Sequence, residues 1–317
     1  MLTYFKLFRW PNLLMIILLE YLLKIAVIET FLSVQNIDFP ISSVWFAILV
    51  ISTVFIAIAG YLTNDISDIA IDKINRPNRA LSSGKLSLAQ AKAMQWFFEV
   101  GGIILGAAVA YHVGNIGLVL IHFFIIVILR AYSNSLKCKG LIGNIAVAFS
   151  TGMLPILIWV FTLFALHKYG TYSSYDFSTI NLIILFYTGF AFWFTLIREI
   201  VKDLEDLKGD QDCNCRTLAV RMPLQNLKNW LMILSAIGIN GILLFQWLLY
   251  QQMPEGLNSI GGDTLFMANF VSIIVILLLH IIPKMVTANS SIDFHKIGNT
   301  LKIIMIAGIL QMFFLLF

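Results

Sequence analysis

Residues 41–72, ISSVWFAILVISTVFIAIAGYLTNDISDIAID, run from an uncharged apolar stretch directly into a cluster of acidic side chains. A helix of about 20 apolar residues crosses the hydrocarbon core of a bilayer. At the polar end, Asn64, Asp68 and Asp72 are spaced i, i+4 and i+8, with Asp65 beside them, so a continuing helix would gather them on one face. The sequence therefore predicts a transmembrane helix that ends in an acidic site.

The rest of the chain has the same apolar character. Its 317 residues are 59% hydrophobic and only 12% charged, with a mean hydropathy of +0.88. Soluble domains are about 25% charged, so this composition excludes a soluble protein. Apolar runs of spanning length occur about nine times, over residues 11–32, 41–63, 93–113, 115–133, 141–164, 180–199, 227–249, 265–283 and 300–317.

These runs are continuously apolar and do not alternate as the strands of a membrane barrel do, so the backbone in lipid must be helical. We therefore expect an all-α fold, a polytopic membrane bundle of about nine transmembrane helices with cytoplasmic cap loops. No linker divides the chain, and residues 1–317 are expected to form a single membrane-embedded domain.

Basic residues alternate from loop to loop. They gather before the first run and in every second connection after it, and Lys168 is the main exception. Because basic loops stay in the cytoplasm, we expect the N-terminus and both acidic clusters on the cytoplasmic side of the cytoplasmic membrane. The first run contains Glu20 and Lys24, which we expect to pair with each other, and it is interpreted as a retained helix and not a signal peptide.

Charge and cysteine content exclude two other functions. The net charge of +4 is spread over several loops and indicates no nucleic-acid partner. Cys138, Cys213 and Cys215 all fall on the expected cytoplasmic side, where we expect reduced thiols. No second Cys or His pair accompanies them, so we expect no zinc site.

A second acidic cluster, Asp203-Leu204-Glu205-Asp206-Leu207-Lys208-Gly209-Asp210, follows another apolar run. Asp203, Asp206 and Asp210 are spaced i, i+3 and i+7, which again makes one acidic helix face. The connections 64–92 and 200–226 share the same order of acidic cluster, basic residues and amphipathic stretch. Internal similarity of this kind in a membrane protein usually places the functional site between the two halves.

Two acidic faces on one side of a membrane favour a Mg²⁺-diphosphate site. Mg²⁺ takes one or two protein carboxylates and completes its shell with water and phosphate oxygens. Neutralising a departing diphosphate would let an allylic carbon–oxygen bond break. Nearby basic side chains would contact the phosphates directly, and the candidates are Arg76, Arg79, Lys137 and Arg216.

Other interpretations stay open at this point. The carboxylates could belong to a structural network with Arg and Lys, or could line the path of a transporter or cation channel. Transport would place ionisable residues near the bilayer midplane, whereas this sequence clusters them at one interface. The chain could also be an assembly protein without activity, and then Asp68→Ala and Asp206→Ala would change no assay.

These residues also resemble a known family. Asn64 to Asp72, followed by Asn75-Arg76-Pro77-Asn78-Arg79, is similar to the NDxxDxxxD and NRPxR signature of the UbiA superfamily of intramembrane prenyltransferases. The second cluster and the number of spans agree, so the resemblance covers the whole chain. Within the superfamily, Arg198 to Asp210 is most similar to the REIxKDxEDxxGD segment of members that attach a geranylgeranyl group to a glycerol-phosphate ether.

The resemblance implies a role for each matched residue. One Mg²⁺ would be bound by Asn64, Asp65, Asp68 and Asp72, and the other by Asp203, Asp206 and Asp210. The expected catalytic carboxylates are Asp68, Asp72, Asp206 and Asp210. The expected substrate-binding residues are Asn12, Arg76, Arg79, Tyr132, Lys137, Arg198, Lys202 and Arg216.

The implied activity is the Mg²⁺-dependent transfer of a prenyl group, expected to be geranylgeranyl, from its diphosphate to a glycerol-phosphate ether lipid. The alternative acceptor is an aromatic quinone precursor of the 4-hydroxybenzoate or naphthoate type, which would gain a carbon–carbon bond. The expected partners are therefore a prenyl diphosphate donor, a lipid-phosphate or aromatic acceptor, and membrane lipid.

Overall fold

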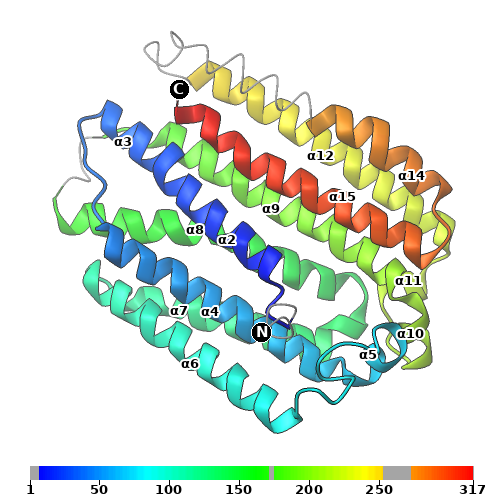
Figure 1. Cartoon of the computed structure of the whole chain (residues 1–317). Helices are drawn as coiled ribbons and strands as arrows, with labels where there is room; N and C mark the ends of the chain where they lie inside the picture. Colours follow the sequence, from blue (N-terminus) through cyan, green and yellow to red (C-terminus); the bar gives the residue numbers. More distant parts are fainter. Residues whose placement is uncertain (1–6, 171–174, 253–272, 317) are drawn as a thin grey trace.

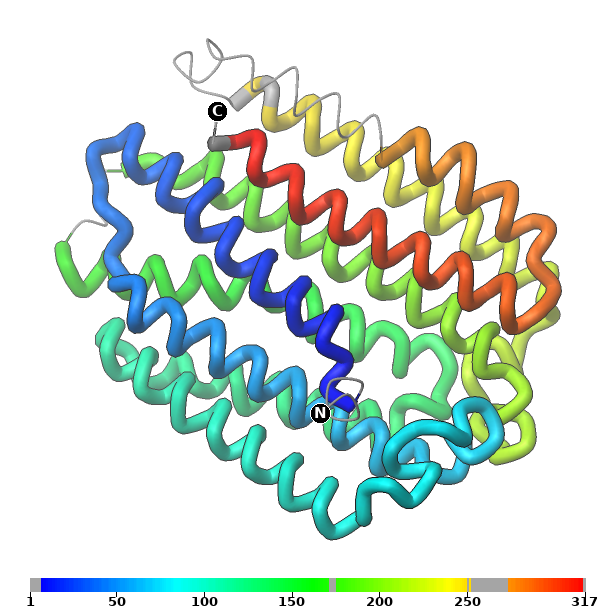
Figure 2. Tube along the Cα trace, viewed as in Figure 1, coloured from blue at the N-terminus to red at the C-terminus, as the bar shows by residue number. Residues whose placement is uncertain are grey.

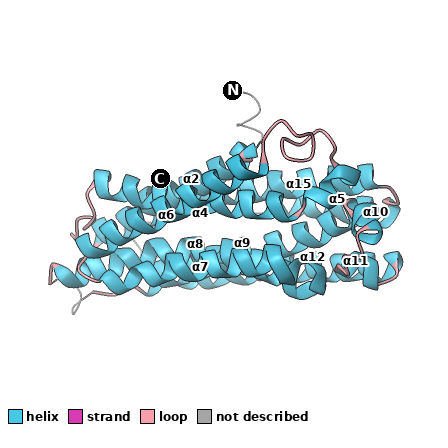
Figure 3. Ribbon diagram, turned by 90° about the horizontal axis from the view of Figure 1, so that it is seen from below, coloured by secondary structure: helices cyan, strands magenta, loops and turns pink. Residues whose placement is uncertain are grey.

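The computed structural model of the protein describes residues 7–170, 175–252 and 273–316, and these residues contain helices and no strand (Figure 3). The α-helices are α2 (Trp10–Leu22), α3 (Thr30–Val34), α4 (Ser43–Ser67), α5 (Ile69–Asn75), α6 (Leu88–His112), α7 (Val119–Ala131), α8 (Leu141–Lys168), α9 (Ser178–Glu205), α10 (Leu207–Asp212), α11 (Leu218–Arg221), α12 (Leu224–Gln252), α14 (Ile282–Thr287) and α15 (Ser291–Leu310). Three π-helical segments interrupt or extend them, η1 (Leu23–Glu29), η3 (Tyr132–Leu136) and η6 (Leu277–Ile281), as do three 3₁₀ segments, η2 (Ile116–Leu118), η4 (Lys137–Lys139) and η7 (Gln311–Leu316).

The prediction of an all-α membrane bundle is confirmed. Seven helical segments of the described part are long and apolar enough to cross a membrane. The first expected span is divided into three consecutive pieces, α2, η1 and α3. The eighth expected span, residues 265–283, lies partly outside the described residues, and its described portion belongs to a shorter apolar helix, Ile273–Thr287.

The long helices run side by side (Figures 1 and 2). Helix α2 lies between α4 and α15, while α4 packs on α6, and α9 packs on α8, α12 and α15. Helices α5, α10 and α11 lie together at one end (Figures 1 and 3), and contacts between α5 and α10 join the two connections that carry the acidic clusters. We call this the motif end of the bundle.

The bundle is apolar both inside and outside. Phe46, Phe161 and Tyr187 are fully buried among the helices. On the outer surface Leu185 and Leu279 are 66% and 74% exposed, which would be unfavourable in water. Hydrocarbon chains solvate such a surface, so the residues that face outward and those that face inward need not differ in polarity.

Each acidic cluster sits on a break between a long helix and a short one. Helix α4 ends at Ser67, and Asp68 (φ −90°, ψ 5°) separates it from α5. Helix α9 ends at Glu205, and Asp206 (φ −92°, ψ 3°) separates it from α10 in the same way. The predicted internal similarity is therefore confirmed down to the backbone conformation of the residue at the break.

The expected pairing of Glu20 with Lys24 is wrong. Lys24 makes its ion pair with Glu29, whereas Glu20 accepts a hydrogen bond of 3.1 Å from Thr53 of α4. Glu20 is completely buried and its second carboxyl oxygen has no partner in the described structure. Tertiary packing of α2 on α4 decides this arrangement, and helical spacing within α2 could not reveal it.

The expectation of three reduced cysteines is also wrong. Cys138 and Cys215 form a disulfide that links the segment after α7 to the segment after α10, with Cα atoms 4.7 Å apart. Only Cys213 is a free thiol in the described structure. The two bonded cysteines are 77 residues apart in sequence, so their proximity depends on the fold.

Candidate active site

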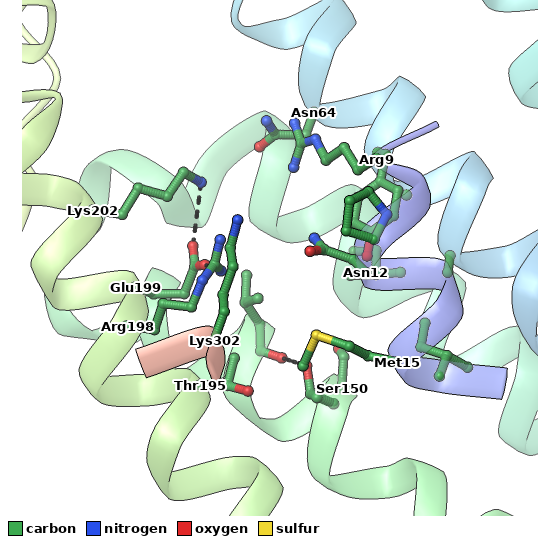
Figure 4. A pocket seen from close by; sticks show the side chains of 18 of the residues that line it. Arg9, Asn12, Met15, Asn64, Ser150, Thr195, Arg198, Glu199, Lys202 and Lys302 are labelled. Atoms are coloured by element: carbon green, nitrogen blue, oxygen red, sulfur yellow. Dashed lines mark hydrogen bonds and ion pairs between the residues drawn. The ribbon is translucent and has the colours of Figure 1, made fainter. Parts of the chain in front are cut away.

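A cavity of about 1320 Å³ opens between the helices beneath the motif end. Its upper wall is polar and carries Arg9, Asn12, Asn64, Arg198 and Lys202 (Figure 4). Its deeper wall is largely apolar and comes from α2, α4, α7, α8, α9 and α15, with these residues among its lining: Leu19, Ile56, Leu129, Leu157, Phe190 and Ile309. The cavity therefore joins a charged opening to an apolar interior.

The first acidic cluster is held by two arginines. Arg9 is placed just before α2 in a left-handed backbone conformation (φ 51°), and its guanidinium lies 2.5 Å from Asp65. Arg79, from the loop after α5, donates to Asp65 at 3.1 Å and to Asp72 at 2.7 Å. All three carboxylates of this cluster are buried at 3–6% exposure, so these cations compensate much of the cost of burying them.

Asp68 lies at the centre of the first cluster and receives two hydrogen bonds. The side-chain amide of Asn64 donates to Asp68 Oδ2 at 2.8 Å, and Lys137 Nζ donates to the same oxygen at 2.5 Å. Lys137 belongs to the 3₁₀ turn that follows η3, so the helical segment of Tyr132 places it over α4. Lys137, which the sequence predicts as a phosphate contact, thus lies against the first cluster.

The second acidic cluster uses different partners. Arg76 contacts both Glu205 and Asp206 at 2.9 Å, so a residue from the loop of the first cluster binds the carboxylates of the second. Asp203 accepts a hydrogen bond of 3.0 Å from Asn144 of α8. Asp210 is 2% exposed, and its Oδ1 has no hydrogen-bond partner in the described structure.

Asn75 clamps the two clusters together. Its amide nitrogen donates to the main-chain oxygen of Asp206 at 3.0 Å, and its amide oxygen accepts from the main-chain nitrogen of Gly209 at 3.1 Å. Residue 209 must be glycine for this contact to form, because a Cβ atom there would lie only 2.4–2.7 Å from the side-chain amide of Asn75. One side chain therefore fixes the position of α10 relative to α5.

Asn75→Ala is expected to lower kcat/KM by about 10- to 100-fold, because a shift of about 1 Å between the two clusters would misplace a substrate bound to both. Gly209→Ala should give a similar loss, since its methyl group would displace the same amide. Steady-state kinetics on both variants checks this prediction. Asn240→Ala is the control, because that exposed amide bonds only within its own helix, and an equal loss in the control would contradict the proposed clamp.

Burial changes the proton affinity of the motif carboxyls outside the spanning helices. Burial raises the pKa of Asp72, and Arg79 opposes that rise. Burial also raises the pKa of Asp210 to about 6, with Lys137 acting in the opposite direction. The pKa of Arg76 is raised because the attraction of Asp206 and Glu205 outweighs its desolvation. Burial therefore disfavours the charged forms of Asp72 and Asp210, and an added cation would stabilise those charged forms.

The donor atoms present fit Mg²⁺ bound jointly with a phosphate. Among the described residues no group of three His, Cys, Asp or Glu side chains converges closely enough to hold a metal ion without other ligands. Two buried oxygens of the clusters, Asn64 Oδ1 and Asp210 Oδ1, lack a hydrogen-bond partner in the part of the chain that the structure describes. Buried acceptors without a donor are unfavourable, and a cation would satisfy them.

Most of the predicted site residues meet at the motif end. Asn12, Asn64, Asp65, Arg76, Arg79, Tyr132, Arg198 and Lys202 line the cavity directly. Asp68, Asp72 and Asp206 do not line the cavity themselves but contact the lining residues Asn64, Arg79 and Arg76. Asp203, Asp210 and Lys137 also lie outside the cavity lining, and Lys137 is linked to it through Asp68 and Asn64.

Arg216 is the exception among the predicted substrate-binding residues. Its side chain is exposed after α10 and is absent from the cavity wall. The reason is that the chain turns away at Asn214, which adopts a left-handed conformation (φ 54°). The structure therefore does not bring Arg216 to the site.

Several site residues were missed by sequence reasoning. Arg9, Glu199 and Lys302 line the cavity, Glu205 binds Arg76, and His295 of α15 contacts Glu205 at 3.1 Å. Lys302 and Glu199 lie within apolar spanning helices, and ionisable residues in such helices usually face a cavity or a partner. That signal was present in the sequence for both residues.

The fold and the site together define a polytopic membrane protein with an acidic, cation-bearing opening to an apolar cavity. Residues 30–279 match the model of the UbiA prenyltransferase family. The chain belongs to this family and is an integral membrane protein. The predicted family and the predicted class of enzyme, a prenyltransferase, are thereby confirmed.

Known relatives agree with this assignment. A digeranylgeranylglyceryl phosphate synthase from Sulfurisphaera tokodaii is 31% identical, over 80% of this chain and 81% of its own length. A solved structure of digeranylgeranylglyceryl phosphate synthase superposes with a TM-score of 0.61 at 21% identity, over 99% of this chain and 96% of that one. A UbiA homologue from Archaeoglobus fulgidus, solved with GPP and Mg²⁺, gives a TM-score of 0.57 at 16% identity, over 98% and 99% of the two chains.

Proposed function

We propose that this protein transfers a geranylgeranyl group from its diphosphate to the free hydroxyl of a glycerol-phosphate ether lipid and releases diphosphate. The observation that carries the proposal is the pair of acidic clusters at the opening of a long apolar cavity. Its volume of about 1320 Å³ exceeds the roughly 300–1,000 Å³ of ordinary small-molecule sites, as expected for isoprenoid chains. The relatives named as digeranylgeranylglyceryl phosphate synthases support the choice of acceptor.

The donor diphosphate would lie between the two clusters. Asn64, Asp65, Asp68 and Asp72 would hold one Mg²⁺ and Asp203, Asp206 and Asp210 the other, as the oxygen donors and their burial suggest. Bound Mg²⁺ would neutralise negative charge on the departing diphosphate. Arg76, Arg79 and Lys137 already contact the clusters and would donate charge-assisted hydrogen bonds to phosphate oxygens.

The bond changes follow from this placement. The allylic carbon–oxygen bond to diphosphate breaks, and its electron pair leaves with the diphosphate. The hydroxyl oxygen of the acceptor then forms a new carbon–oxygen bond to the allylic carbon and loses its proton. Tyr132, buried beneath the opening between the two clusters, would shield the reacting carbon from water, and Asn12 would line the same pocket.

The proposed topology places the motif end at the cytoplasmic face of the cytoplasmic membrane, with the N-terminus inside. Basic residues from distant loops support it, because Arg9, Arg76, Arg79 and Lys137 all meet at this end. A concentration of Lys and Arg at one end of a bundle is the usual mark of the cytoplasmic side, whatever acidic residues accompany them. Soluble substrates and Mg²⁺ would then enter from the cytoplasm.

Purified protein in detergent, given geranylgeranyl diphosphate, Mg²⁺ and geranylgeranylglyceryl phosphate, is expected to release diphosphate and form an ether lipid. Excess EDTA should stop both, and added Mg²⁺ should restore them. Prenylated 4-hydroxybenzoate or naphthoate in place of the ether would move the activity to the aromatic acceptors. No turnover with any acceptor, in protein that elutes as a folded species, would contradict prenyl transfer altogether.

A further inference from the structure

A group of cations lies on one wall of the cavity and takes no part in binding the acidic clusters. Arg198 and Lys202 come from α9, and Lys302 comes from α15, which packs against it. In Figure 4 the side chains of Arg198 and Lys302 lie next to each other and point into the cavity, opposite Arg9, which precedes α2, and Asn12 of α2. We call these three residues the cationic wall.

The cationic wall carries more positive charge than the protein neutralises. Glu199 pairs with Arg198 at 2.8 Å and with Lys202 at 3.4 Å. Lys302 makes no hydrogen bond or ion pair within the described residues. Arg198, Arg9 and Lys202 repel it, and Glu205, which is itself paired with Arg76, attracts it from a distance. Three cations with one carboxylate leave an excess of two positive charges, which matches the charge of about −2 on a phosphate monoester near neutral pH.

Lys302 lies at a depth in the membrane where an unpaired charge is energetically unfavourable. It lies eleven residues into the spanning segment Ser291–Leu315, which is about 16 Å along the helix. A cation at that depth needs a counter-ion or an aqueous cavity. The cavity is present, and no carboxylate is paired with Lys302 in the described part of the chain, so an anionic ligand that enters the cavity would find this ammonium group available as a partner.

The donor diphosphate does not account for this group. The cations that contact the acidic clusters are Arg9, Arg76, Arg79 and Lys137, and each of them is ion-paired with a cluster carboxylate or with Glu205. The cationic wall is paired only with Glu199, which belongs to neither predicted metal-binding set. A phosphate on this wall would therefore be bound without metal.

We propose that Arg198, Lys202 and Lys302 bind the phosphate group of the acceptor lipid, and that Lys302 determines specificity for a phosphorylated acceptor. This inference rests on the proposed function, since it assumes that the second substrate carries a phosphate monoester. Charge-assisted hydrogen bonds from one guanidinium and two ammonium groups would hold that phosphate. The glycerol hydroxyl would then extend across the opening toward the donor carbon.

The test compares Lys302→Met and Arg198→Met with wild type, using geranylgeranylglyceryl phosphate as the acceptor. The KM for this acceptor is expected to rise about 10- to 100-fold, the range for losing a charged hydrogen bond. The KM for geranylgeranyl diphosphate and the Mg²⁺ dependence should stay within about twofold of wild type. Lys296→Met is the matched control, because Lys296 lies on the same helix but is exposed and outside the cavity wall.

A second acceptor separates the phosphate contact from a general defect. With geranylgeranylglycerol, which lacks the phosphate, wild type and both variants should show the same low kcat/KM. The proposal is overturned if Lys302→Met behaves like Lys296→Met, or if it raises the KM of the donor and not that of the acceptor. Absence of any transfer by wild type to the phosphorylated acceptor would instead refute the proposed function itself.

Discussion

Asp68→Asn is expected to lower diphosphate release by about 10²- to 10³-fold at saturating substrates and Mg²⁺, the usual cost of removing one preorganised charge from an active site. Asp68 is 5% exposed, and its Oδ2 receives hydrogen bonds from both Asn64 and Lys137. Asparagine keeps the shape but loses the charge that holds Lys137 and would hold Mg²⁺. Release of diphosphate and formation of the ether product, measured together, check the prediction.

The control for this substitution is Asp212→Asn. Asp212 belongs to α10, beside the second cluster, but its side chain is exposed. The control variant should keep full activity within about twofold, because an exposed carboxylate at the surface contributes little. If Asp68→Asn retained more than about a tenth of wild-type activity, the assignment of Asp68 to the reacting site would be refuted.

Combining Asp68→Asn with Asp206→Asn is expected to cost little more than the worse of the two single substitutions. Asp206→Asn alone should lower activity by about 10²- to 10³-fold, as for the other cluster. The two sites are physically joined, because Arg76 contacts Asp206 and Asn75 donates to its main-chain oxygen. Residues that act as one unit on one ligand lose activity in a non-additive way.

The measurement needs a labelled donor and long incubations, so that a residual rate of the double variant can be recorded. Asp68→Asn combined with Asp212→Asn supplies the comparison, because that pair should fall no further than Asp68→Asn alone. A double variant whose loss equals the product of the two single losses would mean that the clusters act on separate ligands.

Local sequence patterns were enough for the class of fold and for the acidic clusters. Hydropathy gives the helices, because lipid demands that every span satisfy its own backbone hydrogen bonds. The spacing of the carboxylates around Asp68, and of those around Asp206, predicts the two clusters. The structure adds that Asp68 and Asp206 each lie at a helix break of nearly the same backbone conformation. The residues are close in sequence, so short-range geometry was sufficient.

What the sequence did not reveal depends on contacts between distant segments. Arg9 reaches Asp65 because α2 packs on α4, and Glu20 finds Thr53 instead of Lys24 for the same reason. The disulfide between Cys138 and Cys215 joins loops 77 residues apart. Arg216 was assigned to the site from its position near the second cluster, but the turn at Asn214 carries it away.

Lys302 represents a third case, in which the sequence carries part of the information. A lysine inside the apolar span 300–317 is a signal in itself, because placing its charge within the membrane costs free energy. Its location beside Arg198, however, follows only from the packing of α15 on α9. A sequence can therefore indicate that such a residue faces something polar without indicating which other residues share its surroundings.

The cavity wall draws on residues from Leu7 to Ile309, so segments far apart in the sequence meet across it. A nascent chain that ends after α10 therefore already contains both acidic clusters but lacks α15, which completes the cavity wall. Such an incomplete chain is expected to be unable to align both substrates. Completion of the cavity is thus tied to the insertion of α15 in the membrane.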